Sequence, residues 1–273
     1  MHDYHRGELK RQLGLFSATS VVVANMIGTG IFTTPGLIAT ELDQSFSIMF
    51  CWLLGGLFAL SGALCYAELG VIYPQAGGEY AYLRERFGKL MGFLSGWISL
   101  IVGFSAPIAA ASVTLASYVL QIWAVPSGSV ITLSIFGIPV IILSLQVTVA
   151  VFTILMLSFI HYCGVALGSK IQNVLTSFKI IVIVVFIVSA FFVGQGSMSH
   201  FSRGWNLTSL FQDKFAVSLI FVSFSYSGWN AAAYLGSEIK KPDITLPISL
   251  IFGTSFVIVI YLLLNLVYIY SLP

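Results

Sequence analysis

The chain has 273 residues, of which 58% are hydrophobic and 8% are charged, and its formal net charge is +2. Soluble domains carry about 25% charged residues, so this composition excludes an ordinary soluble domain and indicates an integral membrane protein. Strand-type alternation of apolar and polar residues is absent, which argues against a membrane barrel. We therefore expect the lipid bilayer to surround the protein, and we expect no nucleic acid partner.

Seven apolar runs are long enough to cross a membrane, because a spanning helix needs about 20 mostly apolar residues. In chain order they cover residues 13–40, 46–73, 90–124, 138–162, 171–194, 214–239 and 246–272. We therefore expect four parts, which are a short segment at 1–12, five spans within 13–194, a loop at 195–213 and two further spans within 214–273.

The first run contains the stretch ANMIGTGIFTTPG, residues 24–36, with three glycines and a proline. Within hydrocarbon, irregular backbone is tolerated only where protein buries it or where it lines a polar cavity. Alternatively, the glycines serve close helix packing, which is a common use of small residues in membranes. From this run alone, both interpretations stay open.

The sixth run is also interrupted, by VSFSYSGWNAAAYLGSEI at residues 222–239, where serines, a glycine and an asparagine weaken its centre. Paired interruptions in two halves of a chain indicate the mid-membrane site of a secondary transporter. A restarting helix presents amide N–H groups that suit a carboxylate, and an ending helix presents carbonyls that suit an ammonium. The pair fits a zwitterionic amino acid. The sixth run follows the first after five membrane crossings. Because five is an odd number, the sixth run enters the membrane from the opposite face, and a structural repeat of the first five spans would be inverted.

The distribution of Lys and Arg predicts the orientation of the chain, since cytoplasmic loops are enriched in these residues. With the N-terminus in the cytoplasm, only Arg203 and Lys214 lie outside. The residues that then lie inside are Arg6, Lys10, Arg11, Arg84, Arg86, Lys89, Lys170, Lys240 and Lys241. We expect a multi-pass protein of the plasma or inner membrane with a cytoplasmic N-terminus.

Three motifs together resemble the amino acid, polyamine and organocation (APC) transporter superfamily. They are ANMIGTGIFTTPG at 24–36, YAELGVIYPQAGGEYAYLRERFG at 66–88 and SFSYSGWNAAAYLGSEIKKP at 223–242. Within the superfamily, the sequence is similar to L-type amino acid exchangers and bacterial amino acid permeases. The resemblance implies an all-α LeuT-type fold with discontinuous spans 1 and 6, and inverted repeats over spans 1–5 and 6–10. The chain holds only seven of these spans, so we expect it to be part of a longer protein.

The resemblance also implies a substrate site at the two interruptions. Amides would bind the substrate carboxylate, carbonyls would bind its amine, and Phe224 and Trp229 would form a gate. The amides are those of Thr29, Gly30 and Ile31, and the carbonyls lie near Met26, Ile27 and Phe224. The full implied set is Met26, Ile27, Gly28, Thr29, Gly30, Ile31, Phe224, Ser225, Tyr226, Ser227 and Asn230.

Lys179 is a charge inside the fifth run. Its position alone is equally compatible with a lysine whose head reaches the cytoplasmic headgroups. The resemblance implies a surrogate for a coupling cation, because sodium-independent members carry a lysine where sodium-coupled relatives bind an ion. The ammonium would then bridge spans 1 and 5, and a proton-linked role is a further hypothesis.

The loop after the second run reads PQAGGEYAYLRERFG, residues 74–88. Two glycines form a flexible joint, and a helical pattern follows them. The pattern predicts a helix on the membrane surface. The resemblance implies in addition that this segment is part of the inner gate.

The sequence therefore predicts secondary transport of amino acids by alternating access, either by sodium-independent exchange or with proton coupling. Neutral residues in the implied site favour neutral L-amino acids. No enzyme activity, cofactor or metal is expected, and a partner subunit is left open. Two alternatives are disfavoured: an intramembrane serine hydrolase, because Ser227 and His161 lie at different depths, and a seven-span receptor, because its N-terminus would be outside. A channel is disfavoured because no run resembles a selectivity filter.

Overall fold

The structure is a computed structural model that describes residues 11–42, 44–126, 130–135, 138–193, 196–197, 201 and 210–271. The chain divides into two compact units, one of residues 1–82 with 169–273 and one of residues 83–168. The predicted charges Arg6, Lys10 and Arg203 lie outside the described residues, as does most of the predicted loop at 195–213.

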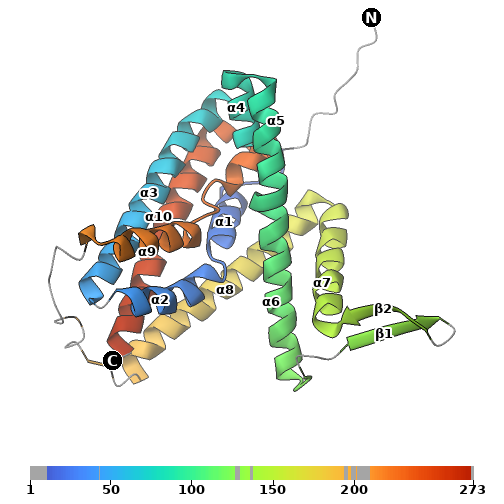
Figure 1. The fold of residues 1–273 in the computed structure, drawn as a ribbon. Helices are drawn as coiled ribbons and strands as arrows, with labels where there is room; N and C mark the ends of the chain where they lie inside the picture. The colour runs from blue at the N-terminus through green and yellow to red at the C-terminus, as the bar shows by residue number, and fades with distance from the viewer. Residues whose placement is uncertain are drawn as a thin grey trace, which may run out of the picture. The chain divides into compact units, whose positions relative to one another are not determined.

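The larger unit is built from helices that bury their small and apolar faces against one another (Figure 1). Its elements are α1 (Leu15–Met26), α2 (Gly30–Glu41), α3 (Ser45–Ile72), most of α8 (Val165–Val193), α9 (Asp213–Ser225), the 3₁₀ helix η4 (Ala231–Glu238) and α10 (Pro242–Ser271). Helix α10 packs along α3 and α1, and α9 packs against α2 and α3. The short helix α4 (Glu79–Phe87) begins in this unit.

Small residues bring α3 close to its neighbours. A Cβ at Gly55 would lie 2.5 Å from the Val222 side chain of α9, and one at Gly56 would lie 3.0 Å from Ile258 of α10. Close approach through small residues is the usual basis of helix packing in membranes. It places the buried rings of Trp52, Tyr226 and Tyr261 in edge-on or tilted contact, with centroids 4.9–5.7 Å apart.

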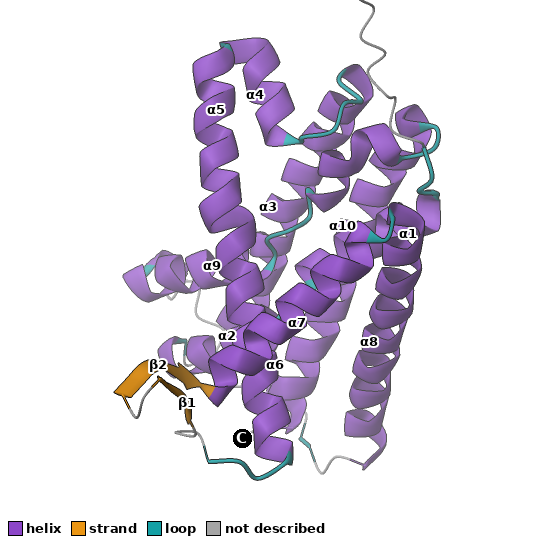
Figure 2. Ribbon diagram, turned by 90° about the vertical axis from the view of Figure 1, so that its right-hand side faces the viewer, coloured by secondary structure: helices purple, strands orange, loops and turns teal. Residues whose placement is uncertain are grey.

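The smaller unit contains a long helix and a hairpin (Figure 2). Helix α5 (Lys89–Ile98) continues through a π-helical stretch, Ser99–Ser105, into α6 (Ala106–Ile122). Strands β1 (Val130–Ile135) and β2 (Ile138–Ser144) pair in antiparallel fashion and lead into α7 (Leu145–Tyr162). Helix α7 packs against α6, where the Gln146 amide donates to the Ser117 hydroxyl at 2.5 Å.

The predicted start of the fourth span, residue 138, is wrong, because its helix begins at Leu145. Residues 138–144 form β2 instead and pair with β1. Both strands are rich in β-branched Ile and Val, which favour strands. Pro139 stands next to the register irregularity of the pair, at a position where a missing N–H is tolerated. The hairpin is a small addition to a helical protein.

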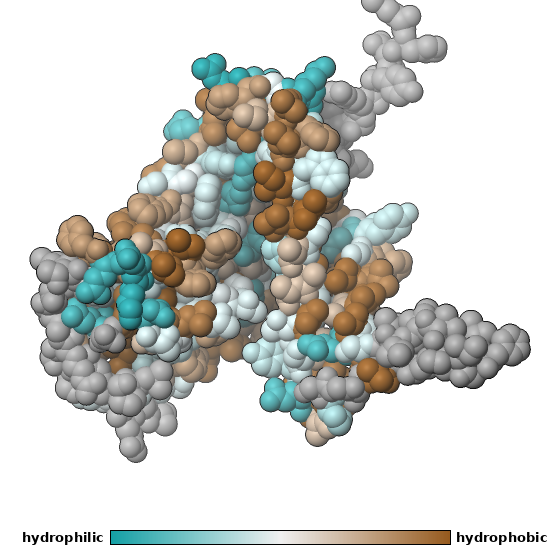
Figure 3. Space-filling view, in the orientation of Figure 1, coloured by the Kyte–Doolittle hydropathy of each residue, from teal (hydrophilic) through white to brown (hydrophobic). Residues whose placement is uncertain are grey.

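Within the described residues, six helical segments are long and apolar enough to cross a membrane. They cover Leu15–Glu41, Ser45–Ile72, Lys89–Ile122, Leu145–Tyr162, Val165–Phe192 and Pro242–Ser271. The remaining predicted run, 214–239, is not one helix, because α9 and η4 are separated by residues 226–230. Apolar residues cover much of the helix surfaces in Figure 3, as expected where lipid or further helices surround them. The protein is therefore a multi-pass membrane protein, and the predicted all-α class with two discontinuous spans is confirmed.

Candidate functional site

The first break separates α1 from α2 at Ile27–Thr29. The Gly28 amide donates to the Met26 carbonyl at 2.9 Å, and backbone bonds resume where the Phe32 amide donates to the Thr29 carbonyl at 3.1 Å. Among the described residues, the amides of Thr29, Gly30 and Ile31 donate to no group. Helix α2 thus presents its unsatisfied N–H groups and the positive end of its dipole at the break.

The second break lies between α9 and η4, and it is held against the first. Gly228 has a positive φ of +98°, and a Cβ there would lie 2.9 Å from the carbonyl carbon and oxygen of Asn25. A Cβ at Gly30 would lie 3.1 Å from the Cα of Ser225. Glycine at these positions allows a close approach of the two backbones, and the positive φ of Gly228 also favours glycine. The two interruptions predicted from the sequence therefore meet in space.

Two side chains connect the helix ends at the breaks. The Ser225 hydroxyl of α9 lies 2.8 Å from the Thr34 hydroxyl of α2. The Tyr261 hydroxyl of α10 donates to the Met26 carbonyl at 2.7 Å and to the Ser225 carbonyl at 3.1 Å. Tyr261 is fully buried, and its single hydroxyl proton is shared between one released carbonyl from each broken helix. Sequence reasoning missed Tyr261, although a tyrosine within VIVIYLLLN was a detectable signal, since buried tyrosines need a hydrogen-bond partner.

Lys179 of α8 points to the first break. Its ammonium donates to the Ile27 carbonyl at 2.6 Å and to the Ala24 carbonyl at 3.3 Å. These carbonyls belong to the C-terminal end of α1, where the dipole favours a cation. The side chain therefore lies against the broken helix, and its predicted role as a cation surrogate remains a prediction.

The other predicted site residues divide by exposure. Gly28, Thr29, Phe224 and Ser227 are exposed beside the breaks, and a Cβ at Gly28 would meet no atom within 4 Å. The side chains of Met26, Ile27, Ile31, Ser225 and Tyr226 are buried, so mainly the backbones of these residues face the break.

Trp229 and Asn230 lie in contacts away from the first break. Trp229 packs edge-on against Tyr66, with centroids 4.9 Å apart, and a Cβ at Gly62 would lie 2.5 Å from its ring. The Asn230 amide donates to the Glu79 carboxylate. The predicted gate and substrate roles of these two residues remain predictions.

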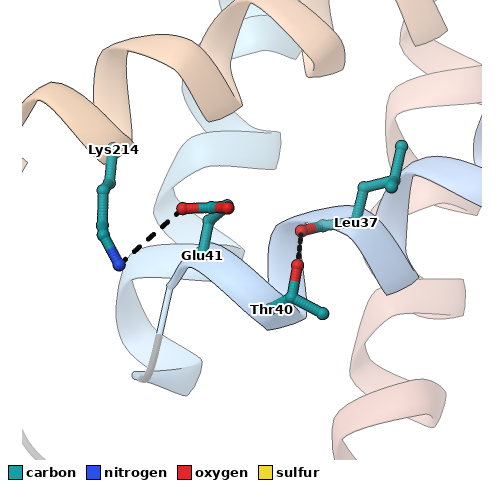
Figure 4. A network of polar contacts seen from close by, with 4 residues as sticks. All are labelled: Leu37, Thr40, Glu41 and Lys214. Atoms are coloured by element: carbon teal, nitrogen blue, oxygen red, sulfur yellow. Dashed lines mark hydrogen bonds and ion pairs between the residues drawn. The ribbon is translucent and has the colours of Figure 1, made fainter.

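An ion pair joins the far ends of α2 and α9. Figure 4 shows Lys214, at the start of α9, beside Glu41, at the end of α2, with their charged atoms 3.7 Å apart. Both side chains are at least half exposed, so the pair contributes little stability. The described residues contain no cluster of three or more His, Cys, Asp or Glu that could hold a metal. His161, the base of the disfavoured hydrolase, has its Nδ1 atom 2.9 Å from the Leu157 carbonyl of its own helix.

Comparison with known proteins supports the resemblance. The sequence model of the family described as amino acid permease matches residues 13–273. The b(0,+)-type amino acid transporter 1 of Mus musculus is 32% identical over 263 residues, which are 95% of this chain and 51% of that protein. The serine/threonine exchanger SteT of Bacillus subtilis is 31% identical over 265 residues, 97% of this chain and 56% of that protein.

The Asc-type amino acid transporter 1 of Mus musculus is 31% identical over 271 residues, which are 96% of this chain and 48% of that protein. The chain thus spans about half the length of the curated relatives that it matches.

Proposed function

Because this chain belongs to the amino acid permease family, we propose that it forms part of a secondary transporter that moves amino acids across the membrane by alternating access. The observation that carries the proposal is the meeting of two broken helices, with the amides of Thr29, Gly30 and Ile31 free at the start of α2. Three convergent N–H groups at a helix N-terminus suit a carboxylate.

The amine of the substrate is bound by backbone carbonyls at the ends of α1 and α9. The Met26 and Ile27 carbonyls already accept bonds from Tyr261 and Lys179, respectively. A carbonyl oxygen has two lone pairs, so the Ile27 carbonyl can accept a second donor, whereas the Met26 carbonyl already accepts from the Gly28 amide as well. Exposed Ser227 and Phe224 then border the substrate.

The substrate is a neutral amino acid, and transport is sodium-independent exchange. The exposed residues beside the breaks are uncharged, and one relative is named a serine/threonine exchanger. The Lys179 ammonium occupies the place of a coupling cation at the end of α1. The substrate leaves unchanged, so no catalytic group is needed.

The orientation follows from the basic residues. The N-terminus lies in the cytoplasm, residues 13–194 form the first repeat, and residues 214–273 begin a second, inverted one. The location is the plasma or inner membrane. The exposure of Lys214 and Lys240 supports this orientation, because the two lysines lie at opposite ends of the interrupted segment 213–239 and can face opposite sides of the membrane.

A binding experiment tests the proposal on protein at its full encoded length, purified in nanodiscs. Thermal unfolding is measured with each of the twenty amino acids. Saturation at about 100 times the dissociation constant stabilises by about 2.7 kcal/mol, which raises Tm by roughly 2–5 °C. We expect such a shift with a few neutral amino acids only.

Gly28→Val is the blocking variant, and Gly36→Val is its control. A Cβ at either position meets no atom within 4 Å, so both positions have room for the first atom of a side chain. Gly28, however, lies at the break, whereas Gly36 lies within α2. Gly28→Val should abolish the shift and Gly36→Val should keep it. Equal shifts in both variants, or no shift with the unaltered protein, would contradict a substrate site at the first break.

A further inference from the structure

The loop before α4 is fastened to η4 by backbone contacts. The Ala76 amide donates to the Ser237 hydroxyl at 2.8 Å, and the Gly77 amide donates to the Tyr234 carbonyl at 3.2 Å. Gly78 has a φ of +51°, and a Cβ there would lie 3.0 Å from the Tyr234 ring. The loop therefore lies directly on the helix that follows the second break.

Glu79 connects this loop to the start of η4. One carboxylate oxygen accepts a hydrogen bond from the Asn230 amide, and the other accepts one from the Tyr234 hydroxyl. Asn230 is the N-terminal cap of η4, and Tyr234 is the fourth residue of that helix. The Tyr66 hydroxyl of α3 faces the same carboxylate. Within the described part of the chain, Glu79 forms no ion pair.

A simpler explanation is that Glu79 only stabilises α4. It lies in the first turn of that helix, where the dipole favours a negative charge. That explanation does not account for two donors from a segment more than 150 residues away. Hydrogen bonds to a carboxylate are stronger than those between neutral groups, and two of them on separate oxygens fix both distance and direction.

We propose that Glu79 is a positioning residue for the second break. By holding Asn230 and Tyr234, it sets where η4 begins, and so it sets the path of residues 226–230 beside the substrate site. Asn230 is then the contact through which Glu79 positions the second break, and it is not a direct substrate ligand. The inference rests on the transport function proposed above and adds a residue to that site.

The first test compares Glu79→Asp with the unaltered protein. Aspartate keeps the charge in the first turn of α4, but its shorter side chain cannot reach both donors. L-serine exchange in proteoliposomes is measured as KM and maximal rate. We expect KM to rise about tenfold in Glu79→Asp, which is the change in affinity expected when one hydrogen bond to a charged group is lost. The maximal rate should stay within about twofold of the original value. Glu85→Gln, an exposed change on the same helix, should leave both values unchanged.

The second test exchanges the two groups. Asn230→Asp places two carboxylates together and should raise KM more than Glu79→Asp does. The double variant Asn230→Asp with Glu79→Gln restores one amide and one carboxylate in reversed positions, so KM should fall back toward the original value. A double variant no better than the worse single variant, or a KM of Glu79→Asp equal to the original, would overturn the proposal.

Failure of the proposed function can be told apart from failure of this inference. Melting temperatures of Glu79→Gln, Tyr234→Phe and their combination measure the contact without any transport. Non-additive changes show that the two side chains interact, and additive changes overturn the inference. If the contact is present but the unaltered protein exchanges no L-serine and binds no amino acid, the transport function fails, and the positioning role fails with it.

Discussion

Tyr261 is the residue on which the geometry of both breaks depends. Its hydroxyl bonds to the Met26 and Ser225 carbonyls and is fully buried. Tyr261→Phe leaves these buried carbonyls short of a donor, which should lower stability by about 1–2 kcal/mol. Thermal unfolding of the purified protein measures the change.

Tyr226→Phe is the matched control for that variant. Tyr226 lies in the same aromatic cluster, with its ring centroid 4.9 Å from that of Tyr261. Its hydroxyl is buried and has no partner among the described residues. Its removal should therefore leave stability unchanged within about 0.5 kcal/mol or raise it. A loss as large as that of Tyr261→Phe would show that the two carbonyl bonds contribute little.

Lys179 is the residue that tests the coupling proposal. Lys179→Met keeps most of the apolar stem but removes the ammonium that bonds to the Ala24 and Ile27 carbonyls. We expect L-serine uptake to fall at least tenfold while the protein remains in the membrane. Lys170→Met, an exposed lysine on the same helix, is the control. Unimpaired uptake by Lys179→Met would remove the coupling role.

At this scale, the sequence revealed residues that are unusual for their surroundings. Lys179 stood out because a charge within hydrocarbon is costly, and Gly28 and Gly30 stood out because they interrupt an apolar run. Tyr261 and Glu79 did not stand out, since their roles depend on carbonyls and side chains that only the folded chain brings near. Their partners lie more than 30 residues away in sequence.

At the scale of elements, the link between α9 and η4 depends on Gly228. Its φ of +98° disfavours any side chain, and a Cβ would lie 2.9 Å from backbone atoms of Asn25. Gly164, between α7 and α8, has a φ of +133° but open space around its Cβ position. Gly164→Ala should lower the free energy of unfolding by about 1 kcal/mol because of backbone strain. Gly228→Ala should lower it by roughly 2–4 kcal/mol, because its Cβ would also be packed too closely against Asn25.

The comparison of these two alanine variants is made by thermal unfolding under one set of conditions. Equal losses of stability in the two variants would mean that α1 moves away from residues 226–230 without a cost in free energy. In that case the two breaks would not be held together by close backbone contact. A larger loss in Gly228→Ala would show that the meeting of the breaks contributes to stability.

The elements were predicted unevenly. Long apolar runs predicted the six candidate membrane-crossing segments found in the described part of the chain, because length and hydropathy are local properties of the sequence. The break at Gly28 was predictable from glycine, and the one at Gly228 from a cluster of serines around it. The hairpin at 130–144 was not, since residues 138–144 are as apolar as the helix that follows them. Pairing with β1, a non-local interaction, decides their conformation.

At the scale of the whole molecule, orientation in the membrane is the remaining prediction. Lys214 and Lys240 are exposed and flank the interrupted segment, and the charge rule places the first outside and the second inside. Each is replaced by cysteine in a protein whose Cys51, Cys65 and Cys163 are changed to alanine. A membrane-impermeant maleimide should label Lys214→Cys on intact cells and Lys240→Cys only after permeabilisation.

The two positions also test the path of the interrupted segment. Because α9 and η4 together replace one spanning helix, labels at their far ends must come from opposite faces of the membrane. Labelling in the reverse order would invert the whole orientation and would place the N-terminus outside. Labelling of both positions from one face would mean that residues 213–239 do not cross the membrane, and it would remove the basis for a substrate site between two broken spans.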